Sequence, residues 1–145
     1  MRVDFYLLSQ GTVEAALPRI ARSVKGAGER LLVVSDDAEQ LTALDKALWE
    51  QFPEDFLAHG RAGEPHAARQ PLLLGDSCTA ENEARYIAFA DGAWRDEAFG
   101  FERAFLFFDN RTLDAARGTW RMLGEREDIE RHFWKQEDGR WVEGP

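Results

Sequence analysis

The arginines of one predicted helix are the residues best suited to binding chemistry. Arg117 and Arg121 are four positions apart, so both project from the same helical face, and Trp120 lies beside them. Arg111 lies near the amino-terminal end of the same segment. Guanidinium groups next to an indole suit an acidic peptide with a hydrophobic end. In the alternative interpretation, Trp120 is a core residue and the arginines pair with the many nearby acids.

A second group of residues is notable for its large apolar side chains. Leu48 and Trp49 end a predicted helix, and Phe56 and His59 follow within ten positions. One helix face and the turn after it usually need fewer large apolar groups than this. These residues therefore form either an exposed patch for a partner or ordinary core, and the sequence leaves both interpretations open.

Residues that could catalyse a reaction lack the context that catalysis needs. Ser9 is not within a G-x-S-x-G turn that would expose a nucleophile. Asp36 and Asp37 follow a predicted strand and could act as paired acids, but acids in this position are also common helix caps, which is how we interpret them. We therefore expect no catalytic residue in this chain.

Metal ligands and thiol chemistry are equally weakly indicated. His59, His66 and His132 have no partner at a spacing such as H-E-x-x-H, and we interpret them as surface or loop histidines. Cys78 is the single cysteine, so it cannot form an internal disulfide. We expect neither a metal nor another cofactor.

Nucleotide binding is the main alternative, because the order of elements resembles that of nucleotide-binding folds. Neither G-x-G-x-x-G nor G-x-x-x-x-G-K-[ST] occurs in the sequence. Gly26 and Gly28 lie between a helix and the next strand, where glycine ends a helix. A nucleotide-binding or small-molecule enzyme on this fold would use the strand ends near Ser9 and Ser35.

Composition limits the class of protein further. The 145 residues fit one domain spanning 1–145, and 44% hydrophobic with 31% charged residues indicates a folded protein. The formal net charge of −9 should repel nucleic acid, so any contact with DNA is expected to be indirect. The first residues lead into a strand and not into an export signal, and no stretch could span a membrane, which predicts a cytoplasmic location.

The elements that would position these residues alternate between strands and helices. Strands are predicted at 3–8, 31–34, 72–74, 86–89 and 104–108, and helices after Thr12, after Asp37 and over 112–123. Pro18 suggests that the first helix starts late. The segment 58–70 is predicted to be a long loop, and Asp138-Gly139 a hairpin turn. This pattern predicts a single three-layer, doubly wound α/β domain with a mostly parallel, Rossmann-like sheet of at least five strands.

Three short motifs in the first half of the chain carry a family resemblance. They are F-Y-L-L over Phe5–Leu8, L-D-x-A-L-W over Leu44–Trp49, and F-x-x-H over Phe56–His59, running into a glycine-containing loop. In this order and spacing, the chain resembles the chi subunit of bacterial DNA polymerase III. The resemblance is strongest over residues 1–64, and the second half keeps the order of a strand followed by a basic helix with an aromatic residue.

The resemblance implies a function without catalysis. Chi-like proteins connect the clamp loader to single-stranded DNA-binding protein during DNA replication, and they do so through two surfaces. One surface binds the psi subunit, and the resemblance assigns it to Leu48, Trp49, Phe56 and His59; a divergent equivalent of psi, or a repair helicase, could use the same surface. The other binds the acidic, Phe-terminated tail of single-stranded DNA-binding protein, and the resemblance assigns it to Arg117, Trp120 and Arg121, with Arg111 nearby.

Overall fold

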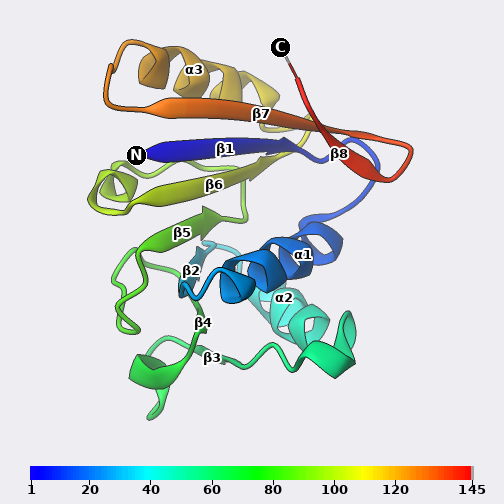
Figure 1. Cartoon of the computed structure of the whole chain (residues 1–145), viewed down its shortest axis with the longest axis vertical. Helices are drawn as coiled ribbons and strands as arrows, with labels where there is room; N and C mark the ends of the chain where they lie inside the picture. The colour runs from blue at the N-terminus through cyan, green and yellow to red at the C-terminus, as the bar shows by residue number, and fades with distance from the viewer. Residues whose placement is uncertain (145) are drawn as a thin grey trace.

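A single mixed sheet organises the chain in the computed structural model, which describes residues 1–144 (Figure 1). Within these residues the strand order is β3-β4-β2-β5-β6-β1-β7-β8, and each neighbouring pair is parallel except β7 with β8. The elements in chain order are β1 (Arg2–Leu7), α1 (Val13–Gly26), β2 (Leu31–Val34), α2 (Ala38–Glu50), η1 (Pro53–Asp55), β3 (His59–Arg61), η2 (Ala67–Arg69), β4 (Leu72–Gly75), β5 (Tyr86–Phe89), η3 (Asp96–Gly100), β6 (Arg103–Phe108), α3 (Leu113–Gly124), β7 (Glu130–Glu137) and β8 (Arg140–Glu143).

Helices cover both faces of the sheet. Leu31 and Val33 of β2 pack in the cluster that contains α1 and α2, whereas Leu32 and Val34 pack in the cluster that contains α3. Successive side chains of a strand point to opposite faces, so a continuous apolar run such as β2 is stable only where both faces are covered. The predicted three-layer α/β fold with a mostly parallel sheet is confirmed.

The first helix begins earlier than predicted. The Thr12 hydroxyl caps α1 by accepting a hydrogen bond from the backbone amide of Ala15 at 3.3 Å, and the helix continues through the buried Pro18. Proline removes one helical hydrogen bond, but α1 buries an apolar stripe that includes Leu17 and Ala21. The expectation of a late start is wrong because this burial outweighs the lost bond.

The segment predicted to be a long loop contains a strand. β3 pairs with β4 in parallel, with His59 opposite Leu72, and η2 follows before the chain enters β4. His-Gly-Arg has no strand pattern of its own, so pairing with β4 makes this strand. His59 is buried and not a surface histidine, whereas His66 is exposed as expected.

The carboxyl-terminal hairpin has the turn that its sequence predicts. Asp138 and Gly139 have φ angles of 51° and 77°, as a tight two-residue turn requires, and β7 and β8 pair on either side of it. Trp134 and Trp141 of the hairpin pack against Tyr6 of β1.

No helix in the described part of the chain is both long and apolar enough to cross a bilayer.

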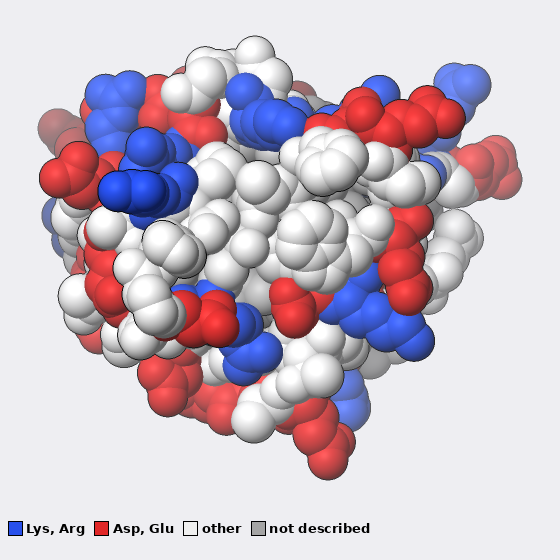
Figure 2. All heavy atoms as spheres, turned by 90° about the horizontal axis from the view of Figure 1, so that it is seen from below, with Lys and Arg blue, Asp and Glu red and all other residues white. Residues whose placement is uncertain are grey.

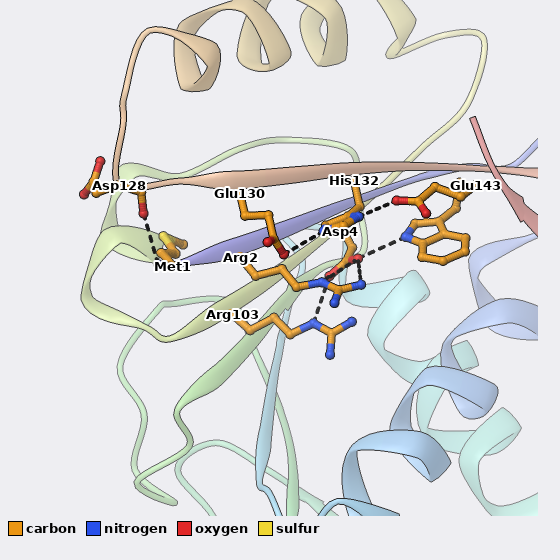
Figure 3. Close-up of polar contacts among 9 residues, drawn as sticks. Met1, Arg2, Asp4, Arg103, Asp128, Glu130, His132 and Glu143 are labelled. Carbon is orange, nitrogen blue, oxygen red and sulfur yellow. Dashed lines mark hydrogen bonds and ion pairs between the residues drawn. The ribbon is translucent and has the colours of Figure 1, made fainter. Parts of the chain in front are cut away.

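A buried carboxylate ties the central strands together. Asp4 of β1 has no exposed surface, and it accepts hydrogen bonds from Arg103 of β6 at 2.8 Å and from the Trp134 indole of β7 at 3.0 Å (Figure 3). Arg2 donates to the same carboxylate. A buried charge is stable when it is paired and hydrogen-bonded, so three neighbouring strands are joined at one residue.

Replacing this carboxylate should destabilise the fold. Asp4→Ala leaves the Trp134 indole without its acceptor and removes the partner of Arg103, so we expect a loss of about 3 kcal/mol in the free energy of unfolding. Urea denaturation followed by tryptophan fluorescence measures it. The control Asp114→Ala, at a fully exposed carboxylate, should change stability by less than about 0.5 kcal/mol. Equal effects of both variants would contradict the structural role of Asp4.

The histidine of β7 makes the hairpin sensitive to pH. Hydrogen bonds to Glu143 of β8 and then to Glu130 raise the pKa of His132 above its usual value (Figure 3). A raised pKa in the folded state means that the protonated imidazole stabilises the protein below pH about 6.5, and that this contribution is lost as the pH rises through the folded-state pKa.

Replacing the His132 imidazole should remove this pH-dependent contribution to stability. We expect His132→Gln to lower the unfolding midpoint at about pH 6 and to have little effect at about pH 9. Thermal unfolding at the two pH values, monitored by circular dichroism, measures the difference. A midpoint difference that stays constant across this range would show that the charge on His132 contributes nothing.

Candidate partner-binding sites

An apolar groove lies between α3 and the sheet. Its volume is about 350 Å³, and apolar side chains from β1, β6, β7 and α3 form most of its wall. Arg117 and Arg121 line the same groove. The apolar members are Phe5, Leu7, Phe108, Leu113, Ala116, Trp120 and Phe133. The structure therefore brings Arg117, Trp120 and Arg121 together, as the helical spacing predicts.

Trp120 forms a fixed wall of this groove. Its ring meets Phe5 edge-to-face at 5.1 Å and Phe133 at 6.5 Å between centroids. The guanidinium of Arg131 lies 4.3 Å from the ring centroid and donates a 2.7 Å hydrogen bond to the Trp120 carbonyl. A ring held on several sides loses little freedom when a ligand packs against it.

Sequence reasoning missed Arg131. It lies on β7, eleven positions after Trp120, and a side chain added at Gly124 would meet its guanidinium at 2.7 Å. Helical spacing cannot find a residue that comes from another element. A basic residue two positions before Phe133 in a strand that packs beside α3 is the only local signal.

The two arginines of the groove have weak partners or none among the described residues. Arg117 lies 3.9 Å from the exposed Asp114 carboxylate, at the limit of an ion pair. Among residues 1–144, no carboxylate forms an ion pair with Arg121. Exposed pairs of this kind contribute little. Both side chains are therefore available to an acidic ligand.

Arg111 lies apart from this groove. Its guanidinium pairs with Asp109 at 3.0 Å, and it lines a different crevice, at the carboxyl ends of the strands. The structure does not bring Arg111 together with Arg117, Trp120 and Arg121.

The residues assigned to the other surface divide into exposed and buried members. Trp49 is 52% exposed and Phe56 is 74% exposed, whereas Leu48 and His59 are buried. The Trp49 ring packs on the His59 ring with 4.4 Å between centroids. We refer to the exposed Trp49 and Phe56, together with the buried Leu48 and His59, as the Trp49–Phe56 patch. Trp49 and Phe56 are therefore exposed, as the partner-patch interpretation expects, and Leu48 and His59 are core residues, as the alternative expects.

His59 supports Trp49 from below. One ring nitrogen lies 2.8 Å from the Leu57 carbonyl oxygen, and the other faces the Asp45 carboxylate of α2. With both nitrogens held, the ring cannot rotate freely. The Trp49 indole therefore rests on a fixed base.

The end of the molecule near β3 has an uncharged centre. Figure 2 views the molecule from the end at which β3 lies in Figure 1 and shows a band of uncharged side chains bordered by acidic and basic ones. Trp49 and Phe56 lie in the segments that precede β3, and His59 is its first residue. An uncharged area with a charged margin is typical of a protein interaction surface.

The crevice where a nucleotide would bind has the wrong charge for phosphate. It has a volume of about 590 Å³, lies between the carboxyl ends of β1 and β6, and is lined by Glu14, Asp91 and Asp109 with Arg111 as its cation. Burial alone would raise the pKa of Asp91, but hydrogen bonds from Arg95 and from backbone amides lower it. Carboxylates that stay ionised repel phosphate, so this lining does not favour the nucleotide-binding alternative.

The other residues considered for chemistry have structural partners. Asp37 caps α2 by accepting from the amides of Glu39 and Gln40, as predicted, and Asp36 lies 3.1 Å from Arg95. The buried Ser35 hydroxyl is bonded to Gln40. No cluster of three or more histidine, cysteine or acidic side chains suited to a metal ion occurs within residues 1–144.

Comparison with known proteins agrees with the motif resemblance. The family model of the DNA polymerase III chi subunit, HolC, matches residues 1–129. The chain is 37% identical over 77 residues to DNA polymerase III subunit chi of Escherichia coli (strain K12), covering 48% of this chain and 52% of that protein. It is 30% identical over 74 residues to the subunit of the same name from Haemophilus influenzae, covering 49% and 51%.

The span of the family model contains every residue of the Trp49–Phe56 patch and all residues of the groove except Phe133. The chain spans about half the length of the curated relatives it matches, whereas the family model covers all elements from β1 through α3. The motifs over Phe5–Leu8, Leu44–Trp49 and Phe56–His59 lie within the matched span. The predicted resemblance is confirmed: this chain belongs to the DNA polymerase III chi subunit family.

Proposed function

We propose that this protein is a non-catalytic accessory subunit that links the clamp-loader complex of DNA polymerase III to single-stranded DNA-binding protein in the bacterial cytoplasm. The observation that carries the proposal is the apolar groove of α3, with Arg117 and Arg121 beside it, in a chain whose net charge is −9. Membership of the chi family supports the same role. Contact with DNA is indirect in this proposal, because so acidic a chain repels phosphates.

The groove suits an acidic tail that ends in phenylalanine. The terminal ring would lie against Trp120 and Phe133, and the tail carboxylates would pair with Arg117 and Arg121. Such contacts are partly exposed and screened by salt, so the affinity should be micromolar, about 8 kcal/mol, and fall as ionic strength rises.

The Trp49–Phe56 patch suits the partner that tethers the subunit to the clamp loader, which is psi, a divergent equivalent or a repair helicase. Tryptophan and other large aromatic residues dominate the binding energy of many interfaces. Trp49 and Phe56 are exposed, and the buried His59 ring packs against the Trp49 ring. In this proposal Trp49 and Phe56 contact the partner, and His59 positions Trp49.

The two surfaces are far enough apart to be occupied together. Figure 1 shows β3 toward one end of the sheet and α3 with β7 toward the other. The patch contains His59 of β3, and the groove is lined by residues of α3, β1, β6 and β7. Six inter-strand steps separate β3 from β7, which is about 29 Å along the sheet at a spacing of about 4.8 Å. One molecule could therefore hold both partners, as a linker must.

Removing both arginines should weaken tail binding. We expect Arg117→Ala with Arg121→Ala to reduce the affinity for a synthetic acidic peptide ending in Pro-Phe by roughly 30-fold, about 2 kcal/mol, because two charge-assisted contacts are lost. Fluorescence anisotropy with a labelled peptide measures it. Arg111→Ala is the matched control and should change the affinity less than about twofold, since Arg111 does not line the groove. Unchanged affinity in the double variant would refute this site.

Truncating the exposed Trp49 or Phe56 side chain should weaken binding of the psi subunit. We expect Trp49→Ala or Phe56→Ala to reduce affinity for purified psi subunit by about 2 kcal/mol each while leaving tail binding unchanged. Surface plasmon resonance measures both interactions on the same protein. Val142→Ala, which truncates another exposed apolar residue on β8, is the control. Psi binding that survives loss of both rings would place the partner elsewhere.

A further inference from the structure

Phe56 adopts a backbone conformation that phenylalanine rarely adopts. Its φ angle is 45°, in the left-handed region that suits glycine and is strained for a bulky side chain. Phe56 is 74% exposed, so burial in the core does not compensate for the strain. Some other interaction must hold the backbone in this state.

Two basic residues of α1 make that interaction. The Lys25 ammonium donates hydrogen bonds to the backbone carbonyls of Asp55 at 2.8 Å and Phe56 at 3.0 Å. The Arg22 guanidinium pairs with the Asp55 carboxylate at 2.8 Å and lies 4.8 Å from the Phe52 ring centroid. The last turns of α1 therefore contact backbone and side chains of a segment some thirty positions further along the chain.

The other side of the same segment is also fixed. Leu57 is buried in the core beneath α1 and α2, and the Ala58 amide donates a 2.8 Å hydrogen bond back to the Phe56 carbonyl. That carbonyl thus accepts from both Lys25 and Ala58. With the following residue anchored and its own carbonyl bound twice, Phe56 directs its ring away from the core.

We propose that Arg22 and Lys25 are positioning residues that hold Phe56 in its strained conformation and so preorganise the Trp49–Phe56 patch for its partner. The inference deepens the proposed function of that patch, on which its consequence for binding rests. A backbone segment that is already held in one conformation does not have to be ordered on association, so affinity improves without an added contact. Neither basic residue needs to contact the partner.

Hydrogen–deuterium exchange tests the clamp without any partner. The amides of Asp55 and Ala58 are bonded within the segment and report its order. We expect Lys25→Met with Arg22→Met to speed their exchange by about threefold to tenfold, with the amides of the central strands unchanged. The single variant Lys25→Arg keeps a basic side chain at this position and should keep the slow exchange of the wild type. Lys46→Met, at an exposed lysine of α2, should have no effect. Unchanged exchange at Asp55 and Ala58 would overturn the proposal.

Binding to purified psi subunit then separates the inference from the proposed function. We expect the double variant to bind psi about threefold to tenfold more weakly and the acidic tail peptide as tightly as the wild type, which also shows that α3 and the sheet are intact. If the wild type itself does not bind psi, the proposed partner is wrong, and exchange alone decides the clamp. If Phe56→Ala weakens psi binding but the double variant does not, the positioning role is wrong.

A substitution that relieves the strain gives an independent readout. Asparagine adopts the left-handed conformation more readily than phenylalanine, so Phe56→Asn should raise the unfolding midpoint although it weakens psi binding. Phe56→Ala keeps the unfavourable conformation and should not raise the midpoint. A lower midpoint for Phe56→Asn than for Phe56→Ala would show that this backbone stores no strain for the partner to exploit.

Discussion

The central strands of this sheet carry apolar side chains on both faces. Both faces must be covered, and this requirement determines where the helices lie. β2 is apolar at each of its four positions, so α1 and α2 must cover one face and the α3 layer the other. The crossover from β1 through α1 runs to one side of the sheet, and the crossover from β6 through α3 runs to the other. The two candidate surfaces thus follow from the way the core is covered.

Burial also explains why the polar exceptions in the interior are so fully bonded. Asp4 can occupy the middle of β1 because donors from three strands surround its carboxylate. His59 is held in the same manner between Leu57 and Asp45. In both places, polar contacts join elements that apolar packing brings close without fixing their register.

Local signals identified the elements well. Thr12 and Asp37 are caps recognisable from their types, and the turn at Asp138 and Gly139 needs only two adjacent residues. β3 escaped prediction because its three residues form a strand only when β4 is beside them. Pro18 led to the wrong prediction of a late helix start, because the rule that proline removes one hydrogen bond takes no account of the burial of a whole helix face.

The candidate sites divide in the same way. Arg117, Trp120 and Arg121 share one helix, so their proximity can be read from spacing, whereas Arg131 reaches Trp120 from a strand. The Trp49–Phe56 patch was indicated by its residue types, but which members are exposed depends on contacts with α1 and β3. Sequence periodicity contains no information about such contacts.

The two edge strands of the sheet are short and carry charged residues. β3 has three residues, one of them glycine, and β8 has four, with Arg140 and Glu143 at its ends. Unpaired strand edges invite edge-to-edge aggregation, and brief, charged margins discourage it. Pairing of two copies of the chain through backbone hydrogen bonds is therefore disfavoured at both edges of the sheet.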